Sequence, residues 1–181
     1  MRSALILGSA NCLRDDLERA LDLGEFDCVI ACKGAGLIWS GSLAAWVSLH
    51  PERLPGDIAR RQARGFPPAE RTYGHKPVPG VSHHMNYRWP DQKTSGSSGL
   101  FALRVAIEEF GCDRNVLCGI PLDKSLGRVD GLSHWPGAMA FKRGWEETLP
   151  IIRDKARSMS GWTRNLLGEP TTSWLYDEVG N

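Results

Sequence analysis

The sequence lacks several features that would assign a protein to a functional class at once. No run approaches the ~20 consecutive apolar residues of a membrane span, so we expect no transmembrane helix. The 22 basic and 21 acidic residues nearly cancel to a net charge of +1, which leaves no overall field to attract nucleic acid or a membrane. The first residues, MRSALILGSANC, contain one Arg and a very short apolar stretch, which is typical of a first strand rather than a signal peptide.

The cysteine pattern excludes two further classes. The five cysteines are an odd number and contain no Cys-x-x-Cys pair, which argues against a zinc ribbon and a thioredoxin-type redox motif. Cys28, Cys32 and Cys118 lie in or beside apolar runs, where a free thiol is normally a small buried hydrophobic group. We expect a cytoplasmic protein, because a reducing compartment keeps thiols free.

What is present indicates one globular domain. The 181 residues are 41% apolar and 24% charged, which is enough to bury a core. Because there is no internal repeat, low-complexity tract or convincing linker, we predict a single domain over residues 1–181. The segments 77–94 and 123–141 lack apolar periodicity and are predicted to be long functional loops, and 161–181 a C-terminal helical tail.

Short apolar runs alternate with helical patterns along the chain. SALILG at 3–8 and FDCVIAC at 26–32 read as buried strands, and between them apolar residues from Leu13 to Leu21 fall on one helical face. This order implies a right-handed crossover and parallel pairing. Further strands are predicted at 44–50, 70–78 and 115–120, and helices after Pro51, at 100–110 and at 142–161. The predicted fold class is α/β, a single-domain Rossmann-like three-layer fold with a mostly parallel sheet.

Ligands of open parallel sheets bind outside the carboxyl ends of the strands. The first strand ends in Gly8, Ser9 and Asn11, where a glycine lets a phosphate approach the backbone and the next helix directs its positive end at the anion. The alternative is a tight turn in which Asn11 caps the helix. Lys33 follows the second strand and offers a point charge for a phosphate, unless it is merely solvated.

The segment SGSSG at 95–99 is the most informative small-residue stretch. It runs directly into LFALRVAIEEF, whose apolar residues recur at helical spacing, so a plain linker is disfavoured. We predict that Ser97, Ser98 and Gly99 form a phosphate-binding loop at a helix start, and that Ser97 or Ser98 caps a helix beginning near Leu100. The alternative is a simple capped turn.

Two residues are candidates for acid–base catalysis. His50 ends the third strand beside Pro51, which fixes the turn. Asp123 follows the strand VLCGIPLD and is placed to bind a hydroxyl or to move a proton, or equally to pair with Arg128. The other histidines, at 75, 83, 84 and 134, have no carboxylate at regular spacing, so no metal site is predicted.

Tryptophan and arginine supply two weaker signals. Trp89, Trp135 and Trp162 lie in segments without core periodicity, where they either line a pocket for a planar or sugar group or cover the edge of the core. The stretch RRQARG at 60–65 is interpreted as a solvated helix face rather than a site for nucleic acid or phosphate.

These pieces resemble a Rossmann-like superfamily that includes sialyltransferases using CMP-activated sugars and 6-hydroxymethylpterin pyrophosphokinase-type proteins. The resemblance rests on LILGSANCL, on VIACKGAGL and on SSGLFALRVAIEEFG leading to VLCGIPLD. WVSLHPERL resembles a segment of uncharacterised, often phage-borne members. Two departures are the absence of the family's Gly-Pro-Ser in the first turn and Pro121-Leu122 standing before Asp123. The resemblance implies nucleotide contacts by Gly8, Ser9, Asn11, Ser97, Ser98 and Gly99, with His50 as base.

The leading functional hypothesis is a nucleotide-binding transferase that moves a glycosyl or phosphoryl group from an activated nucleotide donor, with no cofactor beyond that ligand. A non-catalytic nucleotide sensor is the first alternative, since it needs the phosphate site but no base. A hydrolase that cleaves a nucleotide or N-glycosidic bond is the second, and it would require a carboxylate such as Asp123 or Glu52. Fold alone does not choose among them.

Overall fold

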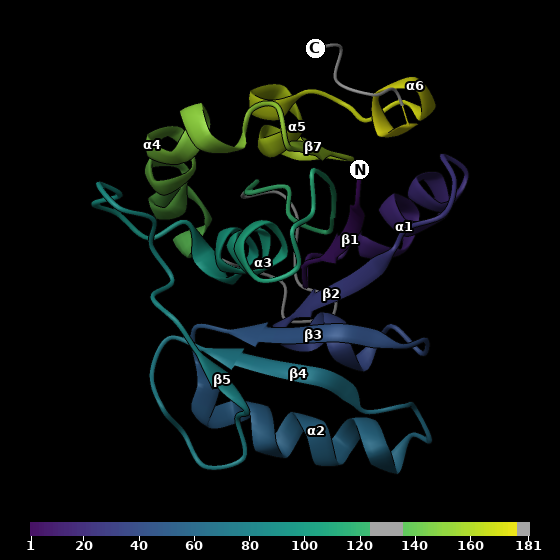
Figure 1. Cartoon of the computed structure of the whole chain (residues 1–181), viewed down its shortest axis with the longest axis vertical. Helices are drawn as coiled ribbons and strands as arrows, with labels where there is room; N and C mark the ends of the chain where they lie inside the picture. Colours follow the sequence, from purple (N-terminus) through teal and green to yellow (C-terminus); the bar gives the residue numbers. More distant parts are fainter. Residues whose placement is uncertain (124–135, 177–181) are drawn as a thin grey trace.

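The chain folds around one seven-stranded sheet in which every neighbouring pair is parallel (Figure 1). The computed structural model describes residues 1–123 and 136–176. The strand order is β5-β4-β3-β2-β1-β6-β7. The strands are β1 (Ser3–Leu7), β2 (Cys28–Cys32), β3 (Leu43–Ser48), β4 (Ala69–Gly74), β5 (His83–His84), β6 (Arg114–Cys118) and β7 (Ala156–Ser158). The predicted α/β class is confirmed.

Helices cover both faces of this sheet and make three layers. The α-helices are α1 (Leu13–Leu21), α2 (Leu54–Ala63), α3 (Ser97–Glu108), α4 (Lys142–Ile152), α5 (Gly161–Leu167) and α6 (Thr172–Tyr176). Short 3₁₀ turns are η1 (Lys33–Leu37), η2 (Pro51–Arg53) and η3 (Pro136–Phe141). Helices α3, α4 and α5 share one buried cluster with alternate strand residues, and α1, α2 and α6 share the cluster on the other face. Strands buried on both faces explain the continuous apolar runs of the sequence.

Helix α3 is more deeply buried than its sequence pattern predicts. A stripe including Ile107 and Phe110 was expected to face the core, yet nearly every residue from Ser97 to Ala106 is buried. The reason is that α3 lies between the sheet and α4 (Figure 1). In addition, the Trp145 indole of α4 donates to Gly96 O at 2.7 Å. The start of α3 is therefore held in place from two sides.

Two local predictions were wrong. The segment 142–161 was expected to be helical, with a kink or a division at Pro150, but α4 contains Pro150 and ends at Ile152, and β7 pairs with β6 in the register Asn115↔Ala156. Pairing with an open strand edge decides this short segment, which propensity alone does not. Leu21 was expected on the buried face of α1 but is 49% exposed, while Asp16 on that face is 1% exposed.

Arg61 was predicted to lie on a solvated helix face, but it is buried. Its side chain is 1% exposed, and burial lowers the pKa of its guanidinium. It donates to four backbone carbonyl oxygens at 2.5–2.6 Å, those of Gly36, Trp39, Gly41 and Pro67. The arginine thereby fixes the loop that links η1 to β3. Its neighbour Arg60 is exposed, as expected, and pairs with Asp57 at 3.2 Å.

Within residues 1–123 and 136–176, no helix combines the length and the apolar content that crossing a membrane requires. The longest, α3, has 12 residues, well below the ~20 that span a bilayer.

Candidate functional site

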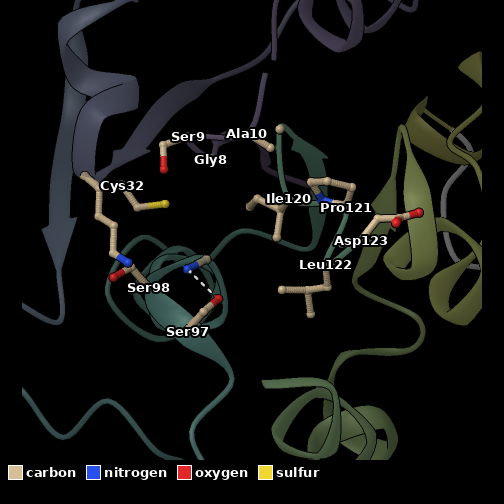
Figure 2. Close-up of a pocket in the computed structure, with 13 residues that line it drawn as sticks. Gly8, Ser9, Ala10, Cys32, Ser97, Ser98, Ile120, Pro121, Leu122 and Asp123 are labelled. Atoms are coloured by element: carbon tan, nitrogen blue, oxygen red, sulfur yellow. Dashed lines mark hydrogen bonds between the residues drawn. The ribbon is translucent and has the colours of Figure 1, made fainter. Parts of the chain in front are cut away.

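A pocket opens at the carboxyl ends of β1, β2 and β6 and at the start of α3 (Figure 2). The chain leaves β1 toward β2 on one side and returns to β6 on the other, so the pocket lies at a topological switch point of the sheet, where ligands bind in such folds. Its empty space is about 560 Å³, with open solvent at the mouth included. It is lined by Gly8, Ser9, Ala10, Cys32, Lys33, Ser97, Ser98, Gly99, Gly119, Ile120, Pro121, Leu122 and Asp123.

Most of the residues singled out from the sequence meet in this pocket. The residues brought together are Gly8, Ser9, Lys33, Ser97, Ser98, Gly99 and Asp123. Asn11 and His50 are outside its lining. Asn11 lies in an exposed turn before α1, whose N-cap residue is Cys12. His50 is exposed and contacts Glu52, with 3.4 Å between Nδ1 and Oε1.

The glycines of the pocket serve packing around Ile120. A Cβ on Gly8 would lie 2.3 Å from Gly119 O and 2.3 Å from Ile120 Cγ1. A Cβ on Gly99 would lie 2.9 Å from Ile120 Cγ2. Gly119 itself has φ +68°, which favours glycine. These contacts explain the glycines without invoking a phosphate close to their backbone, and they bring the ends of β1 and β6 against the start of α3.

The serines at the start of α3 act differently from the predicted capping. The helix begins at Ser97, with Gly96 as N-cap residue and no side-chain cap hydrogen bond. Ser97 Oγ accepts from the Gly99 amide at 3.3 Å, and Ser98 Oγ accepts from the Leu49 amide at 3.1 Å. A hydroxyl that accepts in this way keeps its proton for donation. Both serines can therefore still donate to an anion in the pocket.

Backbone strain concentrates at this pocket. Among the described residues, four that are not glycine have positive φ, and three of them line the pocket: Lys33 at +50°, Ser97 at +76° and Leu122 at +46°. Each such residue costs energy that the surrounding structure must offset. Here the indole of Trp46 donates to Lys33 O at 2.8 Å, and the Trp162 amide donates to Pro121 O at 2.8 Å. Strain held in this way is typical of functional sites.

The ionisable groups in the lining are few. Lys33 brings positive charge and Asp123 negative charge. Cys32 directs its thiol into the pocket (Figure 2). Burial raises the pKa of this thiol to about 11, so it is neutral near pH 7. A neutral thiol is a poor nucleophile. Proton transfer from the pocket wall is therefore left to Asp123 and Lys33.

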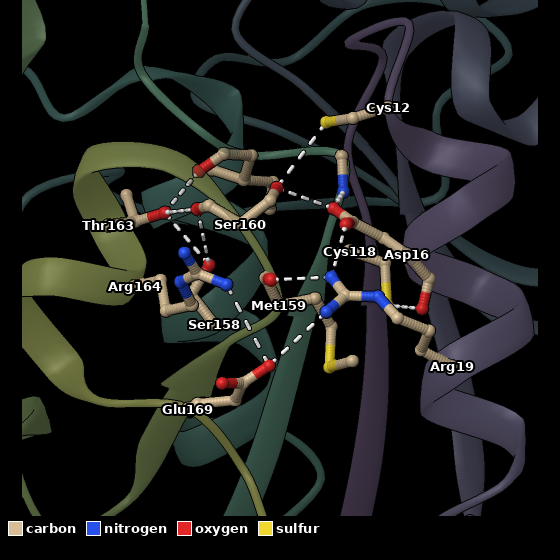
Figure 3. Close-up of polar contacts among 12 residues, drawn as sticks. Cys12, Asp16, Arg19, Cys118, Ser158, Met159, Ser160, Thr163, Arg164 and Glu169 are labelled. Atoms are coloured by element: carbon tan, nitrogen blue, oxygen red, sulfur yellow. Dashed lines mark hydrogen bonds and ion pairs between the residues drawn. The ribbon is translucent and has the colours of Figure 1, made fainter.

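A polar network fixes the segment that follows β6 (Figure 3). The buried carboxylate of Asp16 accepts from the Gly119 amide at 2.8 Å and from Ser160 Oγ at 2.7 Å, and it pairs with Arg19 at 3.2 Å. Thr163 Oγ1 donates to Ile120 O at 2.5 Å. The sequence contained one usable signal for this network: Asp16 falls three residues after Leu13 on the apolar face of α1.

Helix α4 holds the segment before α3. Glu147 Oε2 accepts from the Lys93 amide at 2.9 Å, from the Thr94 amide at 2.9 Å and from Thr94 Oγ1 at 3.0 Å. The hydrogen bond from the Thr94 amide is the main reason why the pKa of Glu147 is lowered. Together with the Trp145–Gly96 bond, it fixes the approach to Ser97 from α4.

The remaining candidates lie elsewhere. His75 Nδ1 is buried without a hydrogen-bond partner among the described residues, and burial lowers its pKa. No group of three or more metal-binding side chains occurs in residues 1–123 or 136–176. Trp89 is 5% exposed in the core, and Trp162 lies under the Lys142 ammonium at 4.9 Å. The predictions for Arg128, His134 and Trp135 concern residues outside the described ranges.

No family model matches the sequence, and no curated protein matches it. The structure is similar to solved structures of the sialyltransferase CstII. One, from Campylobacter jejuni with the substrate analogue cytidine-5′-monophosphate, has a TM-score of 0.63 and 15% identity over 95% of this chain and 86% of that chain. Another, with a trisaccharide acceptor and CMP, has a TM-score of 0.62 and 14% identity over 99% and 89%.

At this identity the likeness establishes the fold and nothing finer. The predicted resemblance to a sialyltransferase-like fold is confirmed. The pterin pyrophosphokinase and phage-borne parts of that resemblance find no support in these comparisons.

Proposed function

We propose that this protein binds a cytidine monophosphate-activated sugar in the pocket and transfers the sugar to an acceptor hydroxyl. The observation that carries the proposal is the meeting of three strained residues, Lys33, Ser97 and Leu122, at the switch point of the sheet. Such strain is maintained where a site must be preorganised. The similarity of the fold to sialyltransferases solved with CMP supports the choice of donor.

The phosphate of the donor is assigned to the start of α3. This helix has 12 residues, so its N-terminus carries a positive dipole end that favours an anion. The hydroxyls of Ser97 and Ser98 donate to the phosphate oxygens, since each already accepts a backbone amide. Lys33 adds a full positive charge from the end of β2.

Two residues compete for the role of base toward the acceptor. Asp123 lines the pocket, whereas His50 lies outside its lining. His50 is nonetheless connected to the site, because the amide of its neighbour Leu49 donates to Ser98 Oγ. The pair that His50 forms with Glu52 orients its imidazole at the carboxyl edge of β3. We assign His50 to deprotonation of the acceptor and Asp123 to binding of a hydroxyl.

One observation favours a second candidate function. Asp123 lies in the pocket itself, where it can activate a water, while His50 does not line it. Cleavage of the nucleotide–sugar bond by water is therefore the alternative to transfer. In that case Asp123 is essential and His50 is dispensable.

Binding is tested by isothermal titration with CMP, cytidine and UMP. We expect CMP to bind, and cytidine to bind at least tenfold more weakly because it lacks the phosphate. Lys33→Met should weaken CMP about tenfold or more, the size of a lost hydrogen bond to a charged group. Lys76→Met removes an exposed lysine outside the pocket and is the matched control. Equal affinity for CMP and cytidine, or no binding of either, contradicts the proposal.

Catalysis is tested by release of CMP from a CMP-activated sugar, with and without an added oligosaccharide acceptor. Transfer predicts release that depends on the acceptor and is abolished in His50→Ala while CMP affinity is retained. Hydrolysis predicts release without acceptor that is abolished in Asp123→Asn. Binding of CMP with no release under either condition would leave only a nucleotide sensor.

A further inference from the structure

Two buried cysteines meet at the edge of the sheet opposite the pocket. Cys28 is the first residue of β2, and Cys112 lies two residues before β6. Their sulfur atoms are 3.6 Å apart, although the residues are separated by 84 positions in the sequence. Cys28 is 7% exposed and Cys112 is 1% exposed. The sulfurs face each other on the α3 side of the sheet, within one hydrophobic cluster.

The contact between the two sulfurs, with Arg2 nearby, favours ionisation of Cys28, against the nearby carboxylates. Arg2 lies beside it, held by a hydrogen bond from its guanidinium to Phe110 O at 2.9 Å and by a position over the Phe110 ring. Asp27 and Glu70 face the pair with negative charge. The hydrogen bond with Cys112 outweighs burial and lowers the pKa of Cys28, and the same contact raises the pKa of Cys112. One thiol thus stabilises the thiolate of the other.

The other three cysteines lie in the opposite kind of environment. Burial raises the pKa of Cys12 to about 12 and that of Cys32 to about 11, and it raises the pKa of Cys118 as well. None of the three lies within hydrogen-bonding distance of another cysteine sulfur in the described structure. Cys28 is therefore the cysteine best suited to react, with Cys112 as its neighbour.

We propose that Cys28 and Cys112 form a reactive dithiol that a hydroperoxide converts to a disulfide. The Cys28 thiolate attacks one oxygen of hydrogen peroxide, the O–O bond breaks, and hydroxide leaves and is protonated to water. Cys112 then loses its proton and attacks the sulfur of the Cys28 sulfenic acid, and the S–O bond breaks to release a second water. Peroxide is reduced, and the two thiols are oxidised.

Disulfide formation requires the two sulfur atoms to approach each other. The sulfurs must approach from 3.6 Å to the ~2.05 Å of a disulfide. Side-chain rotation is the expected route, because each sulfur already faces the other. The bond would connect the start of β2 to the turn after α3 and close a loop that contains β3, β4, β5, α2 and α3. A crosslink over so long a loop restricts the unfolded chain strongly. The inference does not depend on the proposed function.

The first measurement is peptide mapping of the full-length protein, reduced, freed of reductant and exposed to a small excess of hydrogen peroxide without denaturant. We expect the intact mass to fall by about 2 Da for one disulfide formed. Trypsin should yield the peptide 105–114, which contains Cys112, joined to the peptide 20–33. The second peptide contains both Cys28 and Cys32, so fragmentation within Val29–Ala31 identifies the linked sulfur.

The second measurement is the melting temperature before and after oxidation. A crosslink over this loop should raise Tm on the order of 10 °C, and the rise should be reversed by reductant. Cys28→Ser and Cys112→Ser should lose both the link and the rise, while Cys32→Ser, the matched buried control on the same strand, should keep them. If either serine variant fails to fold, the peptide map of the oxidised, unmodified protein still tests whether the Cys28–Cys112 link forms.

Several results would each overturn the proposal. They are a link between other cysteines, stepwise oxidation of single cysteines without any link, and a Cys28–Cys112 link that forms only in denaturant. No reaction at a peroxide excess that oxidises free glutathione completely would overturn it as well.

Discussion

The amino and carboxyl edges of the sheet differ in which residue types occupy the positions of positive φ. At the amino edge, the left-handed positions before β2 and β6 are occupied by glycine, Gly24 at φ +141° and Gly111 at φ +64°. At the carboxyl edge Gly119 has a positive φ as well, but Lys33, Ser97 and Leu122 occupy such positions with full side chains. Glycine is the low-energy choice wherever only a turn is needed. Retaining a side chain at three strained positions of one pocket therefore indicates that those side chains have another task.

The largest effect is expected where the carboxyl edge has no space. Gly8→Ala would place a Cβ 2.3 Å from Gly119 O, a backbone atom that cannot turn aside. We expect a loss of about 3 kcal/mol or more of unfolding free energy by chemical denaturation. Gly56→Ala is the control, because a Cβ there meets nothing within 4 Å, and it should stabilise α2 by about 0.5–1 kcal/mol. Equal effects at both positions would disprove the close approach.

The next effect concerns the network that supports the same edge. Asp16→Ala would leave the Gly119 amide and the Ser160 hydroxyl without their acceptor. We expect a loss of about 2–3 kcal/mol, because unsatisfied buried donors are costly. Asp15→Ala, on the exposed side of the same turn, should change stability by no more than about 0.5 kcal/mol. A similar loss for both variants would assign the effect to the helix rather than to the network.

A third pair of changes, both at Ser97, separates the effect of backbone strain on stability from the effect of the hydroxyl on binding. Ser97→Gly should relieve the cost of φ +76° and raise the free energy of unfolding by about 1 kcal/mol. The same change should weaken CMP binding, since it removes the hydroxyl assigned to the phosphate. Ser97→Ala keeps the strain and removes the hydroxyl, so it should weaken binding without stabilising the fold. If Ser97→Gly is neutral in both assays, the strain has no functional meaning.

The smallest expected effect is a pH dependence of the hydrogen bonds that Lys93 and Thr94 donate to Glu147 on α4. The pKa of Glu147 is lowered from 4.5 in the folded state, so its contribution is present above that value and is lost as pH falls through the folded pKa. Glu147→Gln should therefore lower Tm near neutral pH, and the difference from the unmodified protein should shrink below pH 4.5. Glu146→Gln, at an exposed position on the same helix, is the control. A difference that does not change with pH would contradict the role of the charge.

The parallel sheet and the meeting of most pocket residues were predictable because they depend on local patterns. Apolar runs alternating with helical periodicity fix a parallel sheet, and parallel strands bring Gly8, Lys33 and Asp123 to one edge. What the sequence did not reveal depends on tertiary contacts. The β7 strand exists because the edge of β6 is available, and Asp16 is buried because the Gly119 amide and Ser160 reach it.

His50 shows the limit of placing a side chain by strand position alone. It follows β3 as predicted, but the 3₁₀ turn at Pro51 and the contact with Glu52 keep it at the surface. Gly8 and Gly99 lie in the pocket, and both need to lack a side chain because of Ile120, which follows β6 and is far from Gly8 in the sequence.

The guanidinium of Arg61 has a consequence for how sequences of this fold can vary in length. Four carbonyl oxygens within residues 36–67 point at one cation that is shielded from water. An insertion or deletion between Gly36 and Gly41 would move at least one of these carbonyl oxygens away from the guanidinium. That oxygen would then be buried without a hydrogen-bond donor, which is costly. Homologues that keep this arginine should therefore keep that spacing, and length changes should gather in other connections.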